Sequence, residues 1–213
     1  MPENTLSAFR RAFERGADSI ELDVHATRDG VVVVHHDPTV ASARSSLRGC
    51  SIADLDWSDL SQVELAPGVG IPTLDEVVRS ASASRRVYVE LKAGAIEELV
   101  AAVLFPLQSR CAVHSFSYDA VKRMKDLAPT IPRGILFDRA SRDIESAMRT
   151  TGARDVWPEW MLIDRALVDR VHDADGRVIA WTVNSRSIAE QLLGMGVDGL
   201  CTDDVRLFDG LKA

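Results

Sequence analysis

Residues 19–35 read Ser-Ile-Glu-Leu-Asp-Val-His-Ala-Thr-Arg-Asp-Gly-Val-Val-Val-Val-His, and their pattern indicates how the sheet of this chain begins. Two β-rich runs flank the Thr-Arg-Asp-Gly segment at 27–30, and an Asp-Gly pair between apolar runs is a strong hairpin signal. The second run is therefore expected to return antiparallel to the first. Because side chains alternate along a strand, Glu21 and Asp23 are expected on one face and their apolar neighbours on the other.

Short β-rich runs and helical patterns alternate over the rest of the chain, as is typical of a parallel α/β fold. Ahead of the hairpin, apolar residues at helical spacing predict a helix over 5–15 that ends at Gly16. The predicted strands cover residues 19–24, 31–35, 87–91, 112–116, 134–137, 155–158, 178–183 and 199–202. Further helices are predicted over residues 95–107, 118–127, 141–150, 165–173 and 187–193, and from Thr73, where Glu76 completes a capping box.

Without the antiparallel return at 31–35, the predicted parallel strands number seven, and a TIM (β/α)8 barrel has eight. Because the chain begins with a loop and a helix, we predict an α/β barrel of this type whose first strand is missing from the given chain. An open seven-stranded sheet is the alternative. No linker or repeat divides residues 1–213, so one domain is expected, with a single long polar excursion over 38–70 that contains a short helical piece near 52–60.

The composition excludes several kinds of protein. Hydrophobic residues make up 46% of the 213 residues and charged residues 27%, which is typical of a globular chain. The chain has 25 Lys and Arg against 32 Asp and Glu, and its net charge of −7 argues against a nucleic-acid partner. The cysteines are too few and too far apart for a zinc site or a disulfide framework: Cys50, Cys111 and Cys201. No apolar run is long enough for a membrane helix and no signal peptide is recognisable, so a cytoplasmic location is expected.

Acidic side chains stand where strands of the predicted barrel end, which is where barrel enzymes carry their chemistry. Glu21 and Asp23 share a face of one strand, and Glu90 lies near the end of another. Carboxylates that converge in a barrel repel one another unless a cation pairs with them. Three of them from neighbouring strands form a hard oxygen site suited to Mg²⁺ or Ca²⁺. Lys92 shares the face of Glu90, and a role limited to neutralising that carboxylate is the alternative for it.

A histidine pair closes the hairpin return, which brings the segment His35-His36-Asp37 back beside the paired carboxylates. A histidine near a metal-bound phosphate can transfer protons at neutral pH, and His36, next to Asp37, is the candidate. Trp181 lies at the end of a late strand, where it either belongs to the core or lines a ligand site. The remaining histidines are expected to have structural roles: His25, His114 and His172.

Together these segments resemble the glycerophosphodiester phosphodiesterase family. The resemblance spans almost the whole chain, and the common order of the segments makes it specific, since each segment alone is a weak signal. The matching segments are Pro2-Glu3-Asn4-Thr5, Glu21-Leu22-Asp23-Val24, Thr27-Arg28-Asp29-Gly30, His36-Asp37-Pro38, Ile71-Pro72-Thr73-Leu74, Glu90-Leu91-Lys92, Ser115-Phe116, Trp181-Thr182-Val183-Asn184 and Thr202-Asp203.

The resemblance implies a TIM barrel that hydrolyses glycerophosphodiesters, which are small molecules, to glycerol 3-phosphate and an alcohol. It implies that the divalent metal, Mg²⁺ or Ca²⁺, is bound by three carboxylates: Glu21, Asp23 and Glu90. His36 would be one of two catalytic histidines and Lys92 would contact the phosphate. Trp181 would line the glycerol side of the substrate, and Glu3 would stand close to the site as a supporting residue.

One segment of the family pattern is absent. The family opens with a strand that ends His-Arg-Gly just before the Pro-Glu-Asn-Thr segment, whereas here Met1 directly precedes Pro2. One catalytic histidine is therefore missing from these 213 residues, and impaired phosphodiesterase activity is expected. Either the natural chain starts upstream of Met1, or the protein is a shortened relative.

Other functions stay open at this point. A non-catalytic barrel relative would bind a metal or a phosphorylated ligand without turnover. A lysophospholipase D-like enzyme would need an apolar groove, for which the segment 38–70 offers Leu47, Ile52, Leu55, Trp57 and Leu60. A purely structural protein is disfavoured by the carboxylates at the strand ends.

Overall fold

The structure of the chain is a computed structural model that describes residues 1–82, 84–140 and 143–211. The chain divides into two units, Met1–Val113 and His114–Ala213. Strand β6 (Cys111–Ser115) begins in the first unit and ends in the second. That residues 1–213 form one domain stays a prediction.

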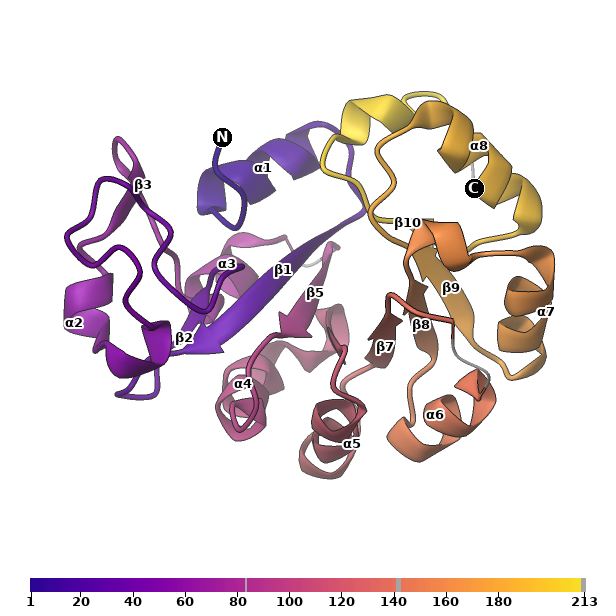
Figure 1. The fold of residues 1–213 in the computed structure, drawn as a ribbon, viewed down its shortest axis with the longest axis horizontal. Helices are drawn as coiled ribbons and strands as arrows, with labels where there is room; N and C mark the ends of the chain where they lie inside the picture. The colour runs from indigo at the N-terminus through magenta and orange to yellow at the C-terminus, as the bar shows by residue number, and fades with distance from the viewer. Residues whose placement is uncertain (83, 141–142, 212–213) are drawn as a thin grey trace. The chain divides into compact units, whose positions relative to one another are not determined.

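The first unit carries the predicted hairpin and a parallel strand beside it (Figure 1). Its sheet has the order β6-β5-β1-β2, in which β5 is parallel to β1 and β2 is antiparallel to it. The strands are β1 (Ser19–Ala26), β2 (Val32–Val34), β3 (Glu64–Ala66), β4 (Val69–Gly70) and β5 (Arg86–Leu91). The helices are α1 (Leu6–Glu14), α2 (Trp57–Leu60), α3 (Leu74–Ser80) and α4 (Glu97–Leu104), with 3-10 turns η1 (Ile52–Asp54) and η2 (Phe105–Arg110).

Local sequence signals account for the boundaries of these elements. In the β1–β2 turn, the backbone N–H of Gly30 donates to the carbonyl of Thr27 over 3.0 Å, and Gly30 has a φ of +83° that favours glycine. Thr5 caps α1 by accepting a hydrogen bond from the N–H of Ala8. The predicted capping box at the start of α3 is confirmed, with both of its hydrogen bonds present.

Alternation along β1 and β5 separates an apolar face from an acidic one. Leu22 and Val24 of β1 and Val89 of β5 are 0% exposed. The intervening residues of both strands point to the opposite face. Asp23 and Glu90 are Cα partners in the parallel register, so these two carboxylates stand side by side on that face.

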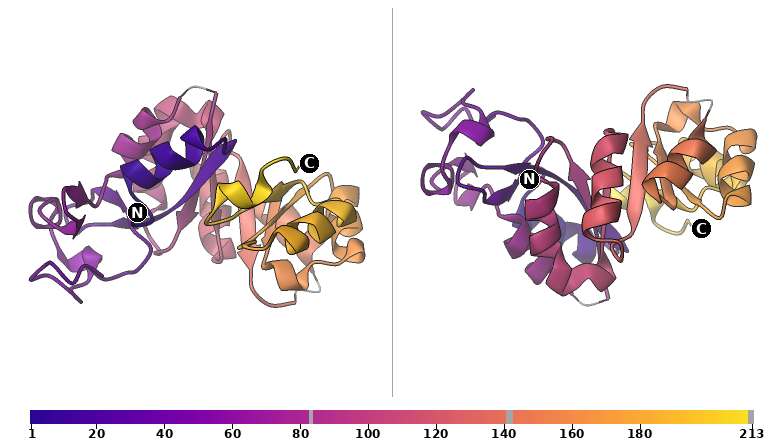
Figure 2. Two further views of the ribbon diagram at one scale, coloured as in Figure 1. Left: turned by 90° about the horizontal axis from the view of Figure 1, so that it is seen from above. Right: turned by 90° about the horizontal axis from the view of Figure 1, so that it is seen from below.

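The segment 38–70 has a small core of its own, and Figure 2 shows it at the end of the first unit that carries β2. Its buried residues pack with Val33 and with Ile71, which directly follows the segment: Val40, Ile52, Leu60 and Val63. The other apolar anchors of the segment pack against the same core: Leu47, Leu55 and Trp57. The apolar side chains that could have lined a groove for a lipid therefore pack in or against this core instead. The β3–β4 hairpin within the segment is an addition to the predicted elements.

The second unit is a run of parallel strands and helices with the sheet order β10-β9-β8-β7. The strands are β7 (Arg133–Phe137), β8 (Asp155–Pro158), β9 (Arg177–Ala180) and β10 (Gly199–Leu200). The helices are α5 (Tyr118–Leu127), α6 (Ile144–Thr151), α7 (Arg165–Asp173) and α8 (Arg186–Met195), with 3-10 turns η3 (Trp160–Leu162) and η4 (Val205–Phe208). Residues 141 and 142 of the helix predicted over 141–150 lie outside the described residues.

Two strands of this unit end earlier than predicted. β9 stops at Ala180 instead of residue 183, and β10 stops at Leu200 instead of residue 202. Beyond these ends the Asn184 side chain accepts hydrogen bonds from the N–H of Asp203 and the hydroxyl of Thr202. A side-chain acceptor thus adds to the backbone hydrogen bond from the N–H of Val183 to the carbonyl of Cys201.

Two further observations concern the described residues. No helix among them has the length and apolar character that crossing a membrane requires. The three cysteines are free thiols: Cys50, Cys111 and Cys201. In both units strands and helices follow one another in the expected order.

Candidate active site

The three carboxylates predicted as metal ligands lie on the acidic face of β1 and β5: Glu21, Asp23 and Glu90. Asp23 is 6% exposed and Glu90 is 7% exposed, and their Cα atoms are partners across the two strands. Glu21 lies two residues before Asp23 on the same strand face. Carboxylates held this close and this deeply repel one another, so the site favours a cation.

Lys92 lies between two of these carboxylates. Its Nζ atom is 3.2 Å from Oε1 of Glu90 and 3.5 Å from Oδ1 of Asp23. Burial lowers the pKa of Lys92, but the charges of Glu90 and Asp23 outweigh it, so the pKa of Lys92 lies above its ordinary value. The ammonium group of Lys92 therefore stays charged. It contacts Asp23 in addition to Glu90, which is the only partner that the sequence predicts for it.

The pKa of Glu21 lies well above its ordinary value. Desolvation and then the negative charge of Asp23 raise its pKa to about 8, although Lys92 and His36 act in the opposite direction. One ammonium does not compensate three carboxylates. A divalent cation would lower the pKa of Glu21 again, so the donor set fits a hard divalent ion.

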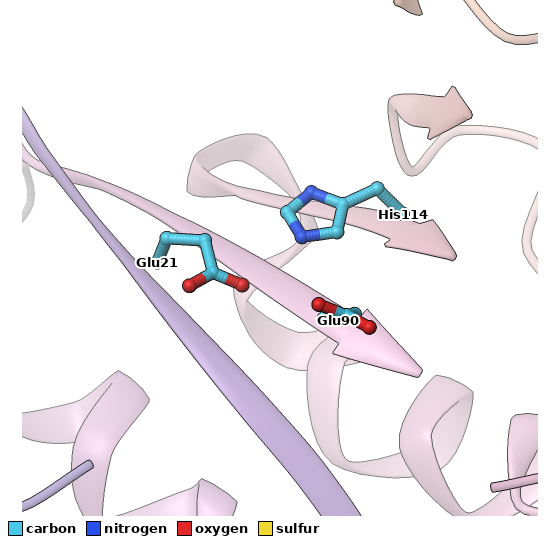
Figure 3. A group of neighbouring side chains, drawn as sticks. All are labelled: Glu21, Glu90 and His114. Atoms are coloured by element: carbon cyan, nitrogen blue, oxygen red, sulfur yellow. The ribbon is translucent and has the colours of Figure 1, made fainter. Parts of the chain in front are cut away.

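Two of the carboxylates also share a small group of ligand atoms with a histidine. One oxygen of Glu21, one oxygen of Glu90 and one ring nitrogen of His114 all lie within 4.8 Å of one another. Figure 3 shows these side chains converging from β1, β5 and β6. A structural role is predicted for His114 from the sequence, where the available signal is a histidine within an apolar strand, directly before Ser115-Phe116.

His36 stands beside the acidic face at the end of the hairpin return. Its Nδ1 atom is 3.0 Å from Oδ1 of Asp37, and its Nε2 atom is 3.3 Å from Nζ of Lys92. Because an ammonium only donates, Nε2 accepts and Nδ1 carries the ring proton toward Asp37. The hydrogen bond to Asp37 raises the pKa of His36 against the opposing effects of burial and of Lys92. The arrangement suits proton transfer through Nε2.

The two neighbouring histidines fix the segment that carries His36. A ring nitrogen of His25, Nε2, lies 3.1 Å from the carbonyl oxygen of His36. The backbone N–H of His35 donates to the carbonyl of Asp23 over 3.0 Å. Burial lowers the pKa of both rings, so His25 and His35 favour the neutral state. His36, which is 52% exposed in its side chain, is the one that faces solvent.

The remaining predicted residues lie in different places. Glu3 is exposed, and its charge contributes to raising the pKa of Glu21 and of His36. Trp181 belongs to the second unit and follows β9 directly. Its indole N–H donates to the carbonyl of Trp157 over 2.8 Å, and its ring meets Phe116 edge-on with centroids 5.5 Å apart. The role of Trp181 at a substrate stays a prediction.

A hollow of about 610 Å³ lies in the first unit, away from this acidic face. It belongs to the segment 38–70 and to α2 and β3. Its lining is mainly polar: Arg44, Ser45, Ser46, Leu47, Asp59, Gln62, Val63 and Glu64. It therefore does not provide the apolar groove that a lysophospholipid chain would need.

The fold and the site define a class of protein. Parallel α/β elements present carboxylates at strand ends, as enzymes of the TIM-barrel class do. The carboxylates suit a divalent cation, and a lysine and a histidine beside them suit an anionic substrate that reacts with proton transfer. The class is a hydrolase of the α/β barrel type whose acidic site suits a divalent cation.

Comparison with known proteins identifies the family. Residues 1–207 match the glycerophosphoryl diester phosphodiesterase family, and the chain belongs to this family of enzymes. It is 30% identical to a glycerophosphodiester phosphodiesterase of Caldanaerobacter subterraneus, over 96% of this chain and 89% of that protein. It is 31% identical to a glycerophosphodiester phosphodiesterase of Bacillus altitudinis, over 95% of this chain and 89% of that protein.

Solved structures agree on the fold. An Oleispira antarctica phosphodiesterase in complex with the product sn-glycerol-3-phosphate superposes with a TM-score of 0.89 at 24% identity, covering 100% of this chain and 92% of that one. The glycerophosphodiester phosphodiesterase of Thermotoga maritima gives a TM-score of 0.83 at 26% identity, covering 100% and 93%. The fold is that of the α/β TIM-barrel enzymes of this family, as the sequence predicts.

Proposed function

We propose that this enzyme hydrolyses glycerophosphodiesters to glycerol 3-phosphate and an alcohol, with Mg²⁺ or Ca²⁺ held by Glu21, Asp23 and Glu90. Membership of the family supports the reaction. The observation that carries the assignment to residues is the acidic face itself, where Lys92 contacts Glu90 and Asp23 while also reaching His36.

The carboxylates would hold the ion at the strand ends. When bound, a divalent ion offsets the negative charge of the phosphodiester and of the transition state. Lys92 adds a fixed positive charge next to that position and binds a phosphate oxygen through its N–H groups. Its raised pKa keeps it charged throughout the neutral range.

His36 moves a proton at Nε2. Asp37 holds the opposite ring nitrogen and thereby fixes the ring and its tautomer. Hydrolysis breaks the bond between phosphorus and the alcohol oxygen while a new bond forms from an attacking oxygen to phosphorus. If water attacks, glycerol 3-phosphate forms directly; if the substrate's own glycerol hydroxyl attacks, a cyclic phosphate forms first and water then opens it to glycerol 3-phosphate. One proton leaves the attacking oxygen and one reaches the departing alcohol, and His36 serves one of these transfers. A single group of this kind is worth about 10²–10⁴ in rate.

Turnover by the 213-residue polypeptide is expected to be slow, because the family pattern pairs His36 with a second histidine that these residues do not supply at the matching position. The carboxylates, Lys92 and His36 all belong to the described residues. Binding of the ion and of glycerol 3-phosphate should therefore persist. We also propose that Trp181 lines the glycerol side and that Glu3 supports the site.

The test uses the 213-residue chain and two probes. Calorimetry with Mg²⁺ and with Ca²⁺ measures ion binding, and a second titration with sn-glycerol 3-phosphate measures ligand binding with the ion or with EDTA. We expect ion binding that Asp23→Asn and Glu90→Gln weaken, and ligand binding that needs the ion. ³¹P NMR of glycerophosphocholine then follows hydrolysis. Absence of ion binding would refute the proposed site, and fast hydrolysis would refute the need for a second histidine.

A further inference from the structure

Asn4 holds Asp23 at two points across 19 residues of sequence. Its side-chain Nδ2 donates to Oδ2 of Asp23 over 2.8 Å, and the backbone N–H of Asp23 donates to Oδ1 of Asn4 over 3.2 Å. Both residues are buried, with 8% of Asn4 and 6% of Asp23 exposed. A backbone N–H only donates and an ionised carboxylate only accepts, so this pairing fixes which end of the amide faces which group.

The clamp divides the two oxygens of the Asp23 carboxylate between different partners. Oδ2 is taken by Asn4, whereas Oδ1 lies 3.5 Å from Nζ of Lys92. Glu90 is the Cα partner of Asp23, and Lys92 contacts it as well. The amide therefore sets the rotation of the carboxylate and leaves Oδ1 as the oxygen that faces the charged centre of the site.

The backbone of Asn4 is held as firmly as its side chain. Its φ is +54°, a left-handed conformation that asparagine tolerates better than most residues other than glycine. The next residue, Thr5, caps α1 and donates its hydroxyl hydrogen bond to the carbonyl of Pro2. The amide thus projects from an anchored helix entry, and it can impose its position on Asp23.

The second unit contains the same clamp on a different aspartate. Nδ2 of Asn184 donates to Oδ2 of Asp203 over 2.6 Å, and the N–H of Asp203 donates to Oδ1 of Asn184 over 3.0 Å, again across 19 residues. These two residues are exposed. The clamp alone is therefore a structural device, and Asn4 differs because the aspartate it holds lies in the acidic site.

We propose that Asn4 is a positioning residue for the divalent ion, because it orients the Asp23 carboxylate so that Oδ1 is presented to the ion. The inference rests on the proposed function, in which Asp23 is a ligand. Hydrogen-bond partners of metal ligands typically change metal affinity by about 10- to 100-fold when they are removed. We expect a change of this size in ion affinity when the side chain of Asn4 is removed. Removal of the Asn184 side chain, which makes the equivalent clamp in the second unit, should leave ion affinity unchanged.

The experiment measures ion affinity by calorimetry with Mg²⁺ or Ca²⁺ alone, with no substrate present. The variants are Asn4→Gly, Asp23→Asn and the double variant, and Asn184→Gly is the matched control. Glycine keeps the positive φ while it removes both clamp hydrogen bonds. Thermal unfolding in EDTA reports the stability of each variant separately.

The expected result is a Kd about 10- to 100-fold weaker for Asn4→Gly and an unchanged Kd for Asn184→Gly, although both lose stability. In the Asp23→Asn background, Asn4→Gly should weaken ion binding little further, because its effect on the Kd depends on the Asp23 carboxylate. An Asn4→Gly protein that binds the ion like the wild type, or an additive double variant, overturns the inference. Failure of the proposed function looks different, because Asp23→Asn itself would then leave ion affinity unchanged.

Should Asn4→Gly not fold, the wild-type protein carries the test. The side-chain NH₂ signals of Asn4 are followed by NMR while Mg²⁺ is added. We expect them to shift with the Kd measured by calorimetry, and signals that stay in place while the ion binds would overturn the inference.

Discussion

The ammonium nitrogen of Lys92 lies 3.3 Å from Nε2 of His36. The group expected to bind phosphate and the group expected to transfer a proton thus share one hydrogen bond. A phosphate oxygen that accepted an N–H of Lys92 would compete with the lone pair of Nε2, so we expect ligand binding to free the nitrogen proposed for proton transfer. The acidic face holds this pair in place, because Glu90 and Asp23 both contact Lys92.

Lys92→Met should separate anion binding from cation binding. The variant loses a charged hydrogen bond to phosphate, which is worth about 1.5–3 kcal/mol, so sn-glycerol 3-phosphate should bind about 10- to 100-fold more weakly. The divalent ion should bind more tightly, because a positive charge next to Asp23 and Glu90 has been removed. Calorimetry measures both affinities. Lys122→Met, on the exposed face of α5, is the control, and a parallel loss of both affinities would contradict the proposed role.

Asp37→Asn should lower the pKa of His36. The hydrogen bond from Asp37 is the largest of the effects that raise this pKa, while burial and Lys92 lower it. Without the carboxylate the imidazolium form is favoured less, so His36 loses its proton at a lower pH than in the wild type. A pH titration of the ring nitrogens by NMR measures the shift. Asp126→Asn on α5 serves as the control, and an unchanged titration of His36 would show that the Asp37 contact has no electrostatic weight.

Much of the site is predictable because it follows from strand geometry. Alternation along a strand places Glu21 with Asp23 and Glu90 with Lys92, and parallel strands bring their ends together. The hairpin signal at 27–30 predicts that the second strand returns antiparallel to the first, which places His36 beside these carboxylates. None of these steps needs knowledge of how distant side chains pack.

The missed features depend on tertiary contacts or on single backbone conformations. The Asn4 clamp needs a φ of +54° and a partner 19 residues away. His114 joins Glu21 and Glu90 through packing of the β6 strand, which a local pattern does not report. The β3–β4 hairpin turns at Gly68, whose φ is +69°, and the pair Pro67-Gly68 at this turn is an available turn signal in the sequence.

The metal-free protein should lose stability as the pH rises, because of Glu21. In the unfolded chain this carboxyl loses its proton near its ordinary pKa of 4.5, whereas in the folded protein its pKa is about 8. Between these values the folded state binds more protons than the unfolded state, so the free energy of unfolding falls as pH increases. Thermal unfolding in EDTA from pH 6 to 8.5 measures the trend. Glu21→Gln should flatten it, the exposed Glu98→Gln should not, and saturating Mg²⁺ should oppose it by binding ionised Glu21.

Two glycines of the second unit should respond to alanine with opposite signs. At Gly176 an added Cβ would lie 2.5 Å from Cε of Met148, 2.8 Å from Cγ1 of Val171 and 3.0 Å from the carbonyl oxygen of Arg154. Overpacking of this kind costs about 1–3 kcal/mol, so Gly176→Ala should lower the free energy of unfolding. Gly194 lies within α8 with nothing within 4 Å of the added Cβ, and alanine in a helix is about 0.5–1 kcal/mol more favourable than glycine. Denaturant titration measures the free energy of unfolding of both variants. If Gly176→Ala changed it in the same way as Gly194→Ala, Met148 and Val171 would have to move aside without a free-energy cost.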